Sequence, residues 1–236
     1  MITLNLSGEL ISDDWAELYR YFGFESGFYC PGDIRAAIAQ LQPGADLVLE
    51  INSIGGQIDA AAEIYALLEK TPNPTRAEVQ SLAASAASYF PLACDRVEMT
   101  LPAQMMIHCV SWGVGGNKHD HLWAAQQLDA ADSSILDVYC RKCGDKTQRS
   151  ELEKLMNEET YLSARQCLEM GLVDAIIGDV SESGTPALVA SIHNNTIRAM
   201  RTLPSIEDLR EKKRAQTEAL DEELANEKAR YAMLLN

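Results

Sequence analysis

Hydrophobic positions along the chain follow two periods, one typical of strands and one typical of helices. Near the N-terminus apolar residues stand at every second position, at Ile2, Leu4 and Leu6, which predicts a strand over residues 2–11. A continuous apolar run over residues 47–51 predicts a second strand that is buried on both faces. Shorter runs predict four more strands, at residues 77–82, 95–99, 105–107 and 172–177.

Apolar residues at helical spacing separate these strands. Pro31-Gly32-Asp33 predicts a helix start with Asp33 as the N-cap, and a second helix is expected to follow the turn at Gly55-Gly56. The longest helical pattern runs from about Lys118 to Cys143. Ser163 and Gln166 form a capping-box pattern for a last helix. Strands and helices that alternate at this spacing predict an α/β fold built of layers.

Composition changes after Gly178 and divides the chain. Serine, glycine and proline gather in residues 181–186, and the segment that opens at Pro204 is highly charged. We therefore expect a domain over residues 1–178, a linker over 179–203 and a charged helical tail over 204–236. The apolar positions of the tail do not keep a heptad, which favours a solvated single helix over a coiled coil.

Charge and cysteine content narrow the function classes. A net charge of −15 argues against non-specific nucleic-acid binding, which needs a basic surface. No apolar run is long enough to span a membrane and the N-terminus lacks the basic start of a signal peptide, so we expect a cytoplasmic protein. The six cysteines are expected to be reduced thiols. Cys140 and Cys143 form a C-x-x-C pair with no second pair, and even with His119 and His121 nearby we expect no metal.

One hexapeptide, residues 83–88, places a hydroxyl among residues with almost no side chain. Small neighbours would let a substrate backbone approach Ser85, and a helix that starts there would point free N–H groups at a developing oxyanion. Alone, such a segment is more typical of a helix start or a packed turn. Ser88 is the rival nucleophile, one helical turn further on.

Three flanking features carry compatible chemistry. Gly55-Gly56 follows a strand and leaves bare backbone N–H groups that could face an oxyanion, although a plain tight turn explains the pair equally well. His108 ends an apolar strand and could act as a general base, while an ordinary packed histidine is the alternative. Glu159 could orient an imidazole, while a solvated surface carboxylate is the alternative.

Together these segments resemble the Clp protease family, the ClpP-like serine peptidases of the crotonase-type fold, from about Ile2 to Ile177. The resemblance rests on four segments in the family's order, which are residues 51–56, 83–87, 106–108 and 161–174. It implies repeated β-β-α layers with a long protruding helix. It also implies a homo-oligomeric ring, polypeptide substrates and no cofactor.

The resemblance implies a role for each candidate residue. Ser85 would be the nucleophile, His108 the general base and Glu159 the acid of a triad. The backbone N–H groups of Gly56 and Ala86 would form the oxyanion hole. An extended substrate would add as a strand beside Ile54 and Gly55, which gives these two residues a substrate-binding role.

The chain departs from the family's usual pattern at several positions. Glu159 stands where the family usually has Asp, Ile54 where it has Pro, Ser81 where it has Gly, and Cys109-Val110 where it has Gln-Pro. These departures and the charged tail favour a phage-type head maturation (prohead) protease that cleaves capsid, scaffold or portal proteins. The alternatives are a housekeeping subunit working with an ATP-dependent unfoldase, a catalytically silent scaffold protein of the same fold, and an acyl-CoA enzyme.

Overall fold

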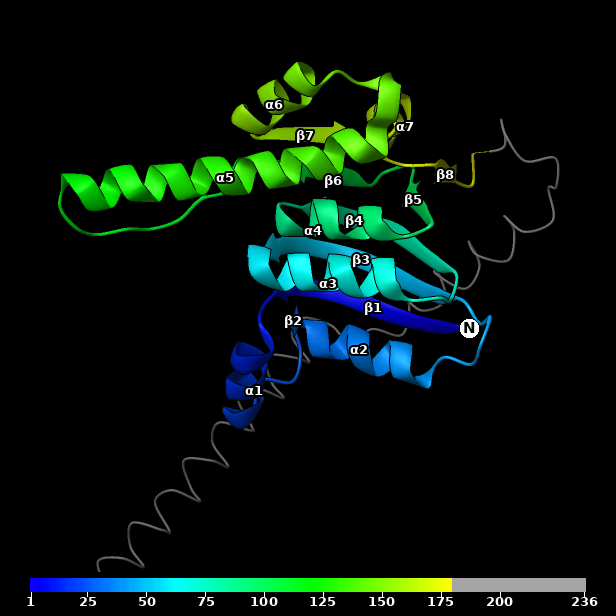
Figure 1. Ribbon diagram of the computed structural model, residues 1–236. Helices are drawn as coiled ribbons and strands as arrows, with labels where there is room; N and C mark the ends of the chain where they lie inside the picture. The colour runs from blue at the N-terminus through cyan, green and yellow to red at the C-terminus, as the bar shows by residue number, and fades with distance from the viewer. Residues whose placement is uncertain (180–236) are drawn as a thin grey trace, which may run out of the picture. The chain divides into compact units, whose positions relative to one another are not determined.

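The computed structural model describes residues 1–179, and the linker and tail expected beyond them lie outside the described residues. Within that part of the chain one sheet of eight strands forms the centre (Figure 1). The strands are β1 (Ile2–Leu10), β2 (Phe28–Tyr29), β3 (Leu47–Gly56), β4 (Thr75–Ala84), β5 (Arg96–Thr100), β6 (Gln104–Ile107), β7 (Thr160–Ser163) and β8 (Ala175–Ile177). The helices are α1 (Asp13–Tyr21), α2 (Pro31–Gln40), α3 (Ile58–Lys70), α4 (Ala86–Tyr89), α5 (Lys118–Cys143), α6 (Arg149–Asn157) and α7 (Ala164–Met170).

The sheet confirms the expected α/β class. Its main path runs β2-β1-β3-β4-β5-β8 with parallel neighbours throughout, and β6 joins β4 in parallel. The pairing of β7 with β6 is antiparallel. One apolar cluster runs from Leu6 in β1 to Ile176 in β8 and buries residues from α2 through α7. Parallel strands covered by helices in this way have the continuous apolar runs that the sequence shows.

Strand β4 determines where the chain's small-residue turn lies. Its first half pairs with β5, up to Val79 opposite Met99. Its second half pairs instead with β6, where Ala84 lies opposite Met106. Strands β5 and β6 therefore pair with β4 near its beginning and up to its last residue, Ala84. The position of the turn that follows is fixed by this pairing at the end of β4.

Helix α5 covers the range that its spacing predicts, Lys118 to Cys143. Asn117 caps its N-terminus in a capping box with Asp120. Figure 1 shows its first half extending away from the sheet, and only Leu136, Tyr139 and Cys143 near its end, with Ala124, are buried. The long protruding helix is therefore confirmed.

Several boundaries differ from the sequence prediction. The N-cap of α2 is Cys30, not Asp33; Asp33 occupies the third helical position, and its carboxylate accepts the backbone N–H of Cys30 at 2.9 Å. Gly55-Gly56 ends β3 and does not form a turn, because both residues still pair with β1. The last strand is shorter than predicted, since β8 begins only at Ala175. Helices α1 and α6 and strand β7 were not predicted.

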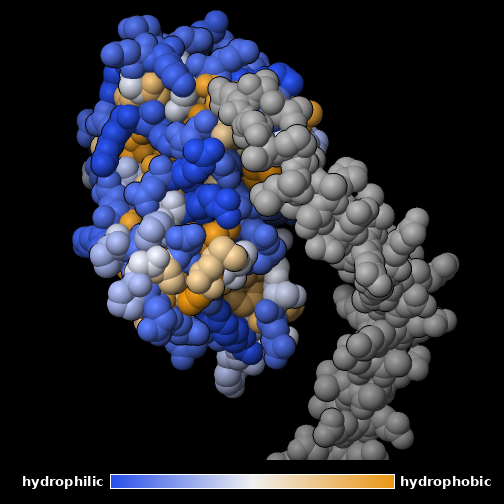
Figure 2. Space-filling view, turned by 90° about the vertical axis from the view of Figure 1, so that its right-hand side faces the viewer, coloured by the Kyte–Doolittle hydropathy of each residue, from blue (hydrophilic) through white to orange (hydrophobic). Residues whose placement is uncertain are grey.

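The surface of the molecule is largely hydrophilic on the side that Figure 2 shows. Figure 2 shows one face of the molecule covered mainly by hydrophilic residues, with apolar colour confined to small patches. No helix within residues 1–179 is both long and apolar enough to cross a bilayer.

Candidate active site

Ser85 lies at the turn between β4 and α4, in a backbone conformation rare for a residue with a side chain. Its φ and ψ are 55° and −127°, and its N–H donates to the Met106 carbonyl of β6 at 2.9 Å. A non-glycine residue held at positive φ costs about 1–3 kcal/mol and persists only where its surroundings enforce it. Strained strand-to-helix turns of this kind present a serine hydroxyl above a sheet.

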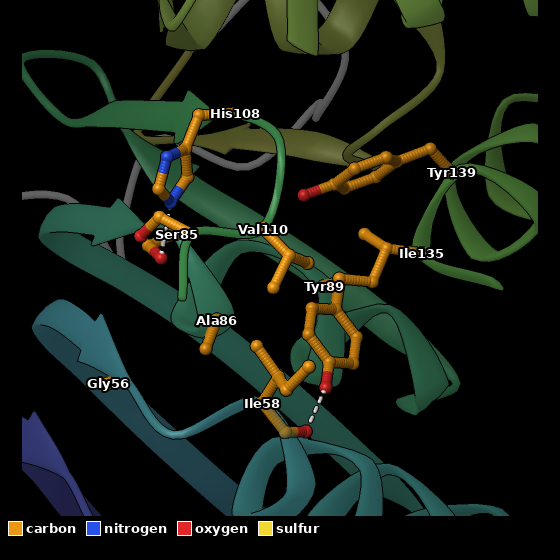
Figure 3. Close-up of a pocket in the computed structure, with 10 residues that line it drawn as sticks. Gly56, Ile58, Ser85, Ala86, Tyr89, His108, Val110, Ile135 and Tyr139 are labelled. Carbon is orange, nitrogen blue, oxygen red and sulfur yellow. Dashed lines mark hydrogen bonds between the residues drawn. The ribbon is translucent and has the colours of Figure 1, made fainter. Parts of the chain in front are cut away.

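His108 follows β6 and meets this hydroxyl. Its Nε2 lies 2.7 Å from the Ser85 Oγ, and both residues are half-buried (Figure 3). The contact follows from the parallel pairing of β4 with β6, which brings both chain segments to the same edge of the sheet. The structure thus brings together a hydroxyl and an imidazole 23 residues apart in sequence, at the distance needed for proton transfer.

The end of β3 packs directly against the Ser85 turn. Gly55 has a φ of +89°, and a Cβ built on it would lie 2.5 Å from the Ala84 carbonyl oxygen and 2.7 Å from the Ser85 Cβ. A side chain at this position would therefore push the turn out of place. The same imagined atom would lie 2.9 Å from the Ala86 nitrogen, which places that N–H beside β3.

The hydrogen bonds around Gly56 indicate on which side of β3 its backbone N–H lies. The next residue, Gln57, donates its N–H to the Leu10 carbonyl of β1, and Gly55 donates to the Ser53 hydroxyl, which itself bonds the Gly8 carbonyl of β1. Successive N–H groups of a strand point to opposite neighbours, so the Gly56 N–H faces away from β1. Ser85 and Ala86 lie on that side.

A pocket opens where these groups meet (Figure 3). Gly56, Ser85, Ala86 and His108 line one part of it. The rest of its wall is mostly apolar or aromatic and comes from α3, α4, α5 and the loop after β6: Ile58, Tyr89, Val110, Ser111, Ile135 and Tyr139. Few polar groups among mainly apolar side chains are typical of a binding site for a substrate side chain.

The backbone of Glu159 lies near this site, but its side chain does not contact the Ser85–His108 pair through a hydrogen bond. Antiparallel pairing of β6 with β7 ends with Ile107 opposite Thr160, so His108 and Glu159 are the next residues in register. The N–H groups of Cys109 and Glu159 both donate to the Met156 carbonyl at 3.2 Å. Glu159 has a φ of 48° and an exposed side chain, and within the described residues its carboxylate makes no hydrogen bond to His108.

Two polar side chains beside the site, Asp132 and Tyr139, were missed by sequence reasoning. Asp132 of α5 accepts the Val110 N–H at 2.6 Å and thereby fixes the loop that follows His108. Burial and this carboxylate raise the pKa of the neighbouring Cys109 thiol.

Ser88, predicted as the rival nucleophile, is fully buried, and its hydroxyl bonds the Ser85 carbonyl and the Tyr139 hydroxyl. Nothing in the small-residue hexapeptide indicated that Ser88 would bond the Tyr139 hydroxyl.

Comparison of the chain with known proteins shows which family it is similar to. The family model for Clp protease matches residues 35–180. The chain belongs to the Clp protease family. It is 32% identical over 139 residues to the ATP-dependent Clp protease proteolytic subunit 1 of Chlamydia muridarum, which covers 57% of this chain and 71% of that protein. It is 30% identical over 134 residues to subunit 2 of Thermobifida fusca, covering 56% of this chain and 65% of that protein.

The Clp protease match defines which parts of the fold are shared. It includes the end of β3, the Ser85 turn, His108, α5 and Glu159, which are all the segments described above. Strand β1, helix α1 and strand β2 precede the matched residues. The mixed α/β fold and the peptidase class expected from the sequence are thereby confirmed.

The described cysteines and histidines form no metal-binding cluster. Within residues 1–179 no group of three or more His, Cys, Asp or Glu side chains is arranged to hold an ion. Of the C-x-x-C pair, Cys143 is buried and Cys140 half-buried, and both are free thiols. Burial raises the pKa of Cys143 to about 11, which disfavours the thiolate that a metal needs. His119 and His121 are exposed at the start of α5.

Proposed function

We propose that this Clp family chain is a serine endopeptidase subunit in which Ser85 is the nucleophile and His108 the general base. The observation that carries the proposal is the 2.7 Å contact between the Ser85 Oγ and the His108 Nε2 at a strained turn. Relatives named as proteolytic subunits of an ATP-dependent protease support it.

The chemistry follows from these two side chains. His108 removes the hydroxyl proton as the Ser85 Oγ attacks a peptide carbonyl, and then gives the proton to the leaving amine. The same imidazole then deprotonates a water molecule, which attacks the acyl-enzyme carbonyl; as the ester bond breaks, the imidazolium returns that proton to the Ser85 Oγ and frees the enzyme. The proton thus passes through His108 in both halves of the reaction.

Two backbone N–H groups are proposed to stabilise the tetrahedral intermediate. In this proposal the Gly56 N–H donates from the end of β3 and the Ala86 N–H from the start of α4. Both residues line the pocket together with Ser85. Rigid donors of this kind are worth about 10²–10³ in turnover each, because they need no rearrangement when negative charge develops.

Glu159 is proposed as the acid that orients His108. Its backbone follows the register of β6 and β7 to a position opposite His108, and its exposed side chain is not held by a hydrogen bond within the described residues. Its extra methylene relative to Asp gives the side chain the length to reach from this exposed position. In this proposal the contact is made when substrate is bound, since catalytic hydrogen bonds often tighten only in the complex.

Polypeptide substrates are proposed to bind in extended form along β3. Ile54 is 65% exposed beside the site, while Gly55 is buried and keeps the strand close to Ser85. The pairing of β3 with β4 ends at Ser53 opposite Ala83, and a substrate strand beside the residues that follow would place one side chain in the mostly apolar pocket. We further propose that the chain forms a homo-oligomeric ring through α5, whose first half carries the exposed Leu122 and Trp123, and that an ATPase supplies unfolded polypeptide.

Replacing the nucleophile tests the proposal. Ser85→Ala is expected to reduce turnover of a fluorogenic peptide by at least about 10³-fold, because removing a nucleophile leaves only binding and oxyanion effects. A fluorophosphonate probe should label Ser85 in the wild type and nothing at that position in the variant. Ser81→Ala is the matched control, since Ser81 is exposed on β4 four residues earlier. Equal activity of the Ser85 and Ser81 variants would overturn the assignment.

A head maturation protease is the second candidate, favoured by the sequence departures at Ile54, Ser81 and Cys109-Val110. The relatives found by comparison are Clp proteolytic subunits, which favours the first candidate. The two differ in their need for a partner. Cleavage of capsid, scaffold or portal proteins by the purified chain without any ATPase would favour the second, and dependence on an unfoldase would favour the first.

A further inference from the structure

Ser88 binds the carbonyl of the proposed nucleophile twice. Its backbone N–H lies 2.9 Å from the Ser85 oxygen and its hydroxyl 2.5 Å from the same atom. Ser88 is fully buried, so no solvent competes for these bonds. On the other side of the turn, the Ser85 N–H is held by the Met106 carbonyl. Both backbone groups of Ser85 are therefore fixed.

The hydroxyls of Ser88 and Tyr139 form a chain with one direction. A carbonyl oxygen can only accept, so the single hydroxyl proton of Ser88 is used in its bond to Ser85. The Tyr139 hydroxyl, 2.6 Å from the Ser88 Oγ, must then be the donor. Tyr139 is 1% exposed on α5, and burial raises the pKa of its hydroxyl, which keeps the proton available for donation.

The atom at the end of this chain belongs to the same peptide group as a proposed oxyanion donor. The Ser85 carbonyl and the Ala86 N–H are opposite ends of one planar, trans peptide unit, so fixing one end aims the other. Hydrogen bonds received by the carbonyl also polarise the peptide and strengthen its N–H as a donor. The Ala86 nitrogen lies beside Gly55, and Ala86 is one of the residues that line the pocket.

We propose that Ser88 and Tyr139 are positioning residues that orient and polarise the Ser85–Ala86 peptide so that its N–H stabilises the oxyanion. This inference rests on the proposed peptidase function. It gives α5 a direct connection to the site, through Tyr139, besides its contribution to the pocket wall. It also explains why a polar pair occupies the apolar interior beneath the small-residue turn.

Tyr139→Phe tests the inference by removing one hydroxyl while keeping the ring. We expect kcat for a fluorogenic peptide to fall about 10-fold with KM unchanged, which is less than the full loss of an oxyanion donor. Affinity for a peptide boronate, which forms a tetrahedral adduct with Ser85, should fall by the same factor. Ser88→Ala should have a larger effect, and the double variant should lose no more than Ser88→Ala alone, because the two hydroxyls act in series.

Thr75→Val is the control, because it also removes one buried hydroxyl while keeping the shape of the side chain. Thr75 is buried at the start of β4, the opposite end of that strand from Ser85, where its hydroxyl donates to the Asp95 carboxylate and accepts the Asp95 N–H outside the pocket. We expect this control to lower thermal stability about as much as Tyr139→Phe and to leave kcat and boronate affinity unchanged. All variants are assayed below their melting temperatures, and Ser88→Ala decides the question if Tyr139→Phe fails to fold.

The possible failures are distinguishable. Equal kinetics for Tyr139→Phe and Thr75→Val, with boronate affinity unchanged, would overturn the positioning role and leave the peptidase assignment intact. A rise in KM at constant kcat would also overturn it, because an oriented oxyanion donor acts on the transition state. A wild-type chain that neither cleaves peptides nor is labelled at Ser85 would overturn the proposed function and this inference together.

Discussion

At the scale of single residues, the site depends on how closely β3 approaches the Ser85 turn. Gly55 leaves no room for a Cβ, since the nearest backbone oxygen would lie 2.5 Å away. Its φ of +89° adds a second reason for glycine, because residues with side chains rarely adopt that conformation. Gly55 is thus needed for the position of the turn as well as for its own backbone.

Gly55→Ala adds only one methyl group, but we expect it to lower both kcat and stability. The added methyl group must displace the Ala84–Ala86 backbone, which would cost about 1–3 kcal/mol of stability and lower kcat at least about tenfold. Gly113→Ala is the control, because a Cβ there meets no atom within 4 Å. Urea unfolding and peptide turnover measure both effects. A Gly55 variant with wild-type kcat would show that the turn tolerates movement.

Glu159 gives a second prediction at this scale. Glu159→Gln should lower kcat at least about tenfold with little change in stability, since an amide cannot stabilise the protonated imidazole as a carboxylate does. Glu158→Gln is the adjacent control; its carboxylate is exposed and lies 3.8 Å from Lys154. Steady-state kinetics on both variants decide it. Unchanged turnover in Glu159→Gln would indicate that no acid, or a different acid, completes the site.

The sequence predicted the residues whose type alone carries chemistry. Ser85 and His108 stood out because a hydroxyl among alanines and a histidine after an apolar strand are unusual, and the structure brings them together. Ser88 and Tyr139 could not be paired from sequence, because their contact depends on how α5 crosses α4. The exposed, unbonded side chain of Glu159 likewise depends on the positive φ at that residue.

At the scale of elements, prediction succeeded where a segment is long or carries its own cap. Helix α5 matched its predicted ends, and α7 begins at Ser163 with Gln166 in the predicted capping box and ends at Gly171. Helix α1 was missed because only Ala16 of it is buried, in a small cluster apart from the main core. Strand β7 has four residues, too few for a period to show.

Asp174 connects three elements and carries a prediction at this scale. Its carboxylate accepts the Val97 N–H of β5 at 2.7 Å and pairs with Lys142 of α5 at 2.8 Å, just before β8. Lys142 is only 14% exposed, so both partners would lose a bond that water replaces poorly. Asp174→Ala should therefore cost about 1–3 kcal/mol in urea unfolding while kcat of the folded enzyme stays near wild type.

Asp137→Ala provides the comparison for Asp174→Ala. Asp137 also pairs with a basic residue, Arg149, but its side chain is 66% exposed. Exposed ion pairs contribute about 0–1 kcal/mol, so this variant should unfold close to the wild type. Equal destabilisation by the two substitutions would show that the Val97 and Lys142 contacts of Asp174 add nothing beyond a surface charge.

At the scale of the whole molecule, one main apolar core extends across the described residues. Its apolar cluster includes Leu172, Val173 and Ile176 at the C-terminal end and reaches back to Leu6. The last described residue, Asp179, pairs with Arg165 of α7 at 3.6 Å, an exposed contact. Residues 1–179 hold an eight-stranded sheet, the helices that cover it and a shared apolar core, which fits the main condition for an independent domain.

We therefore propose a domain boundary close to Gly178 and expect a chain truncated directly after Asp179 to fold. Its melting temperature should stay near that of the full chain, and its kcat for a short peptide should be unchanged, because Ser85, His108, Gly56 and Ala86 all lie in the retained part. Circular dichroism, light scattering and the peptide assay measure fold, assembly and activity separately. Normal peptide cleavage with poor processing of a protein substrate would indicate that residues 180–236 recruit a partner. An insoluble or inactive product would show instead that they belong to the folded core, and the boundary would then be wrong.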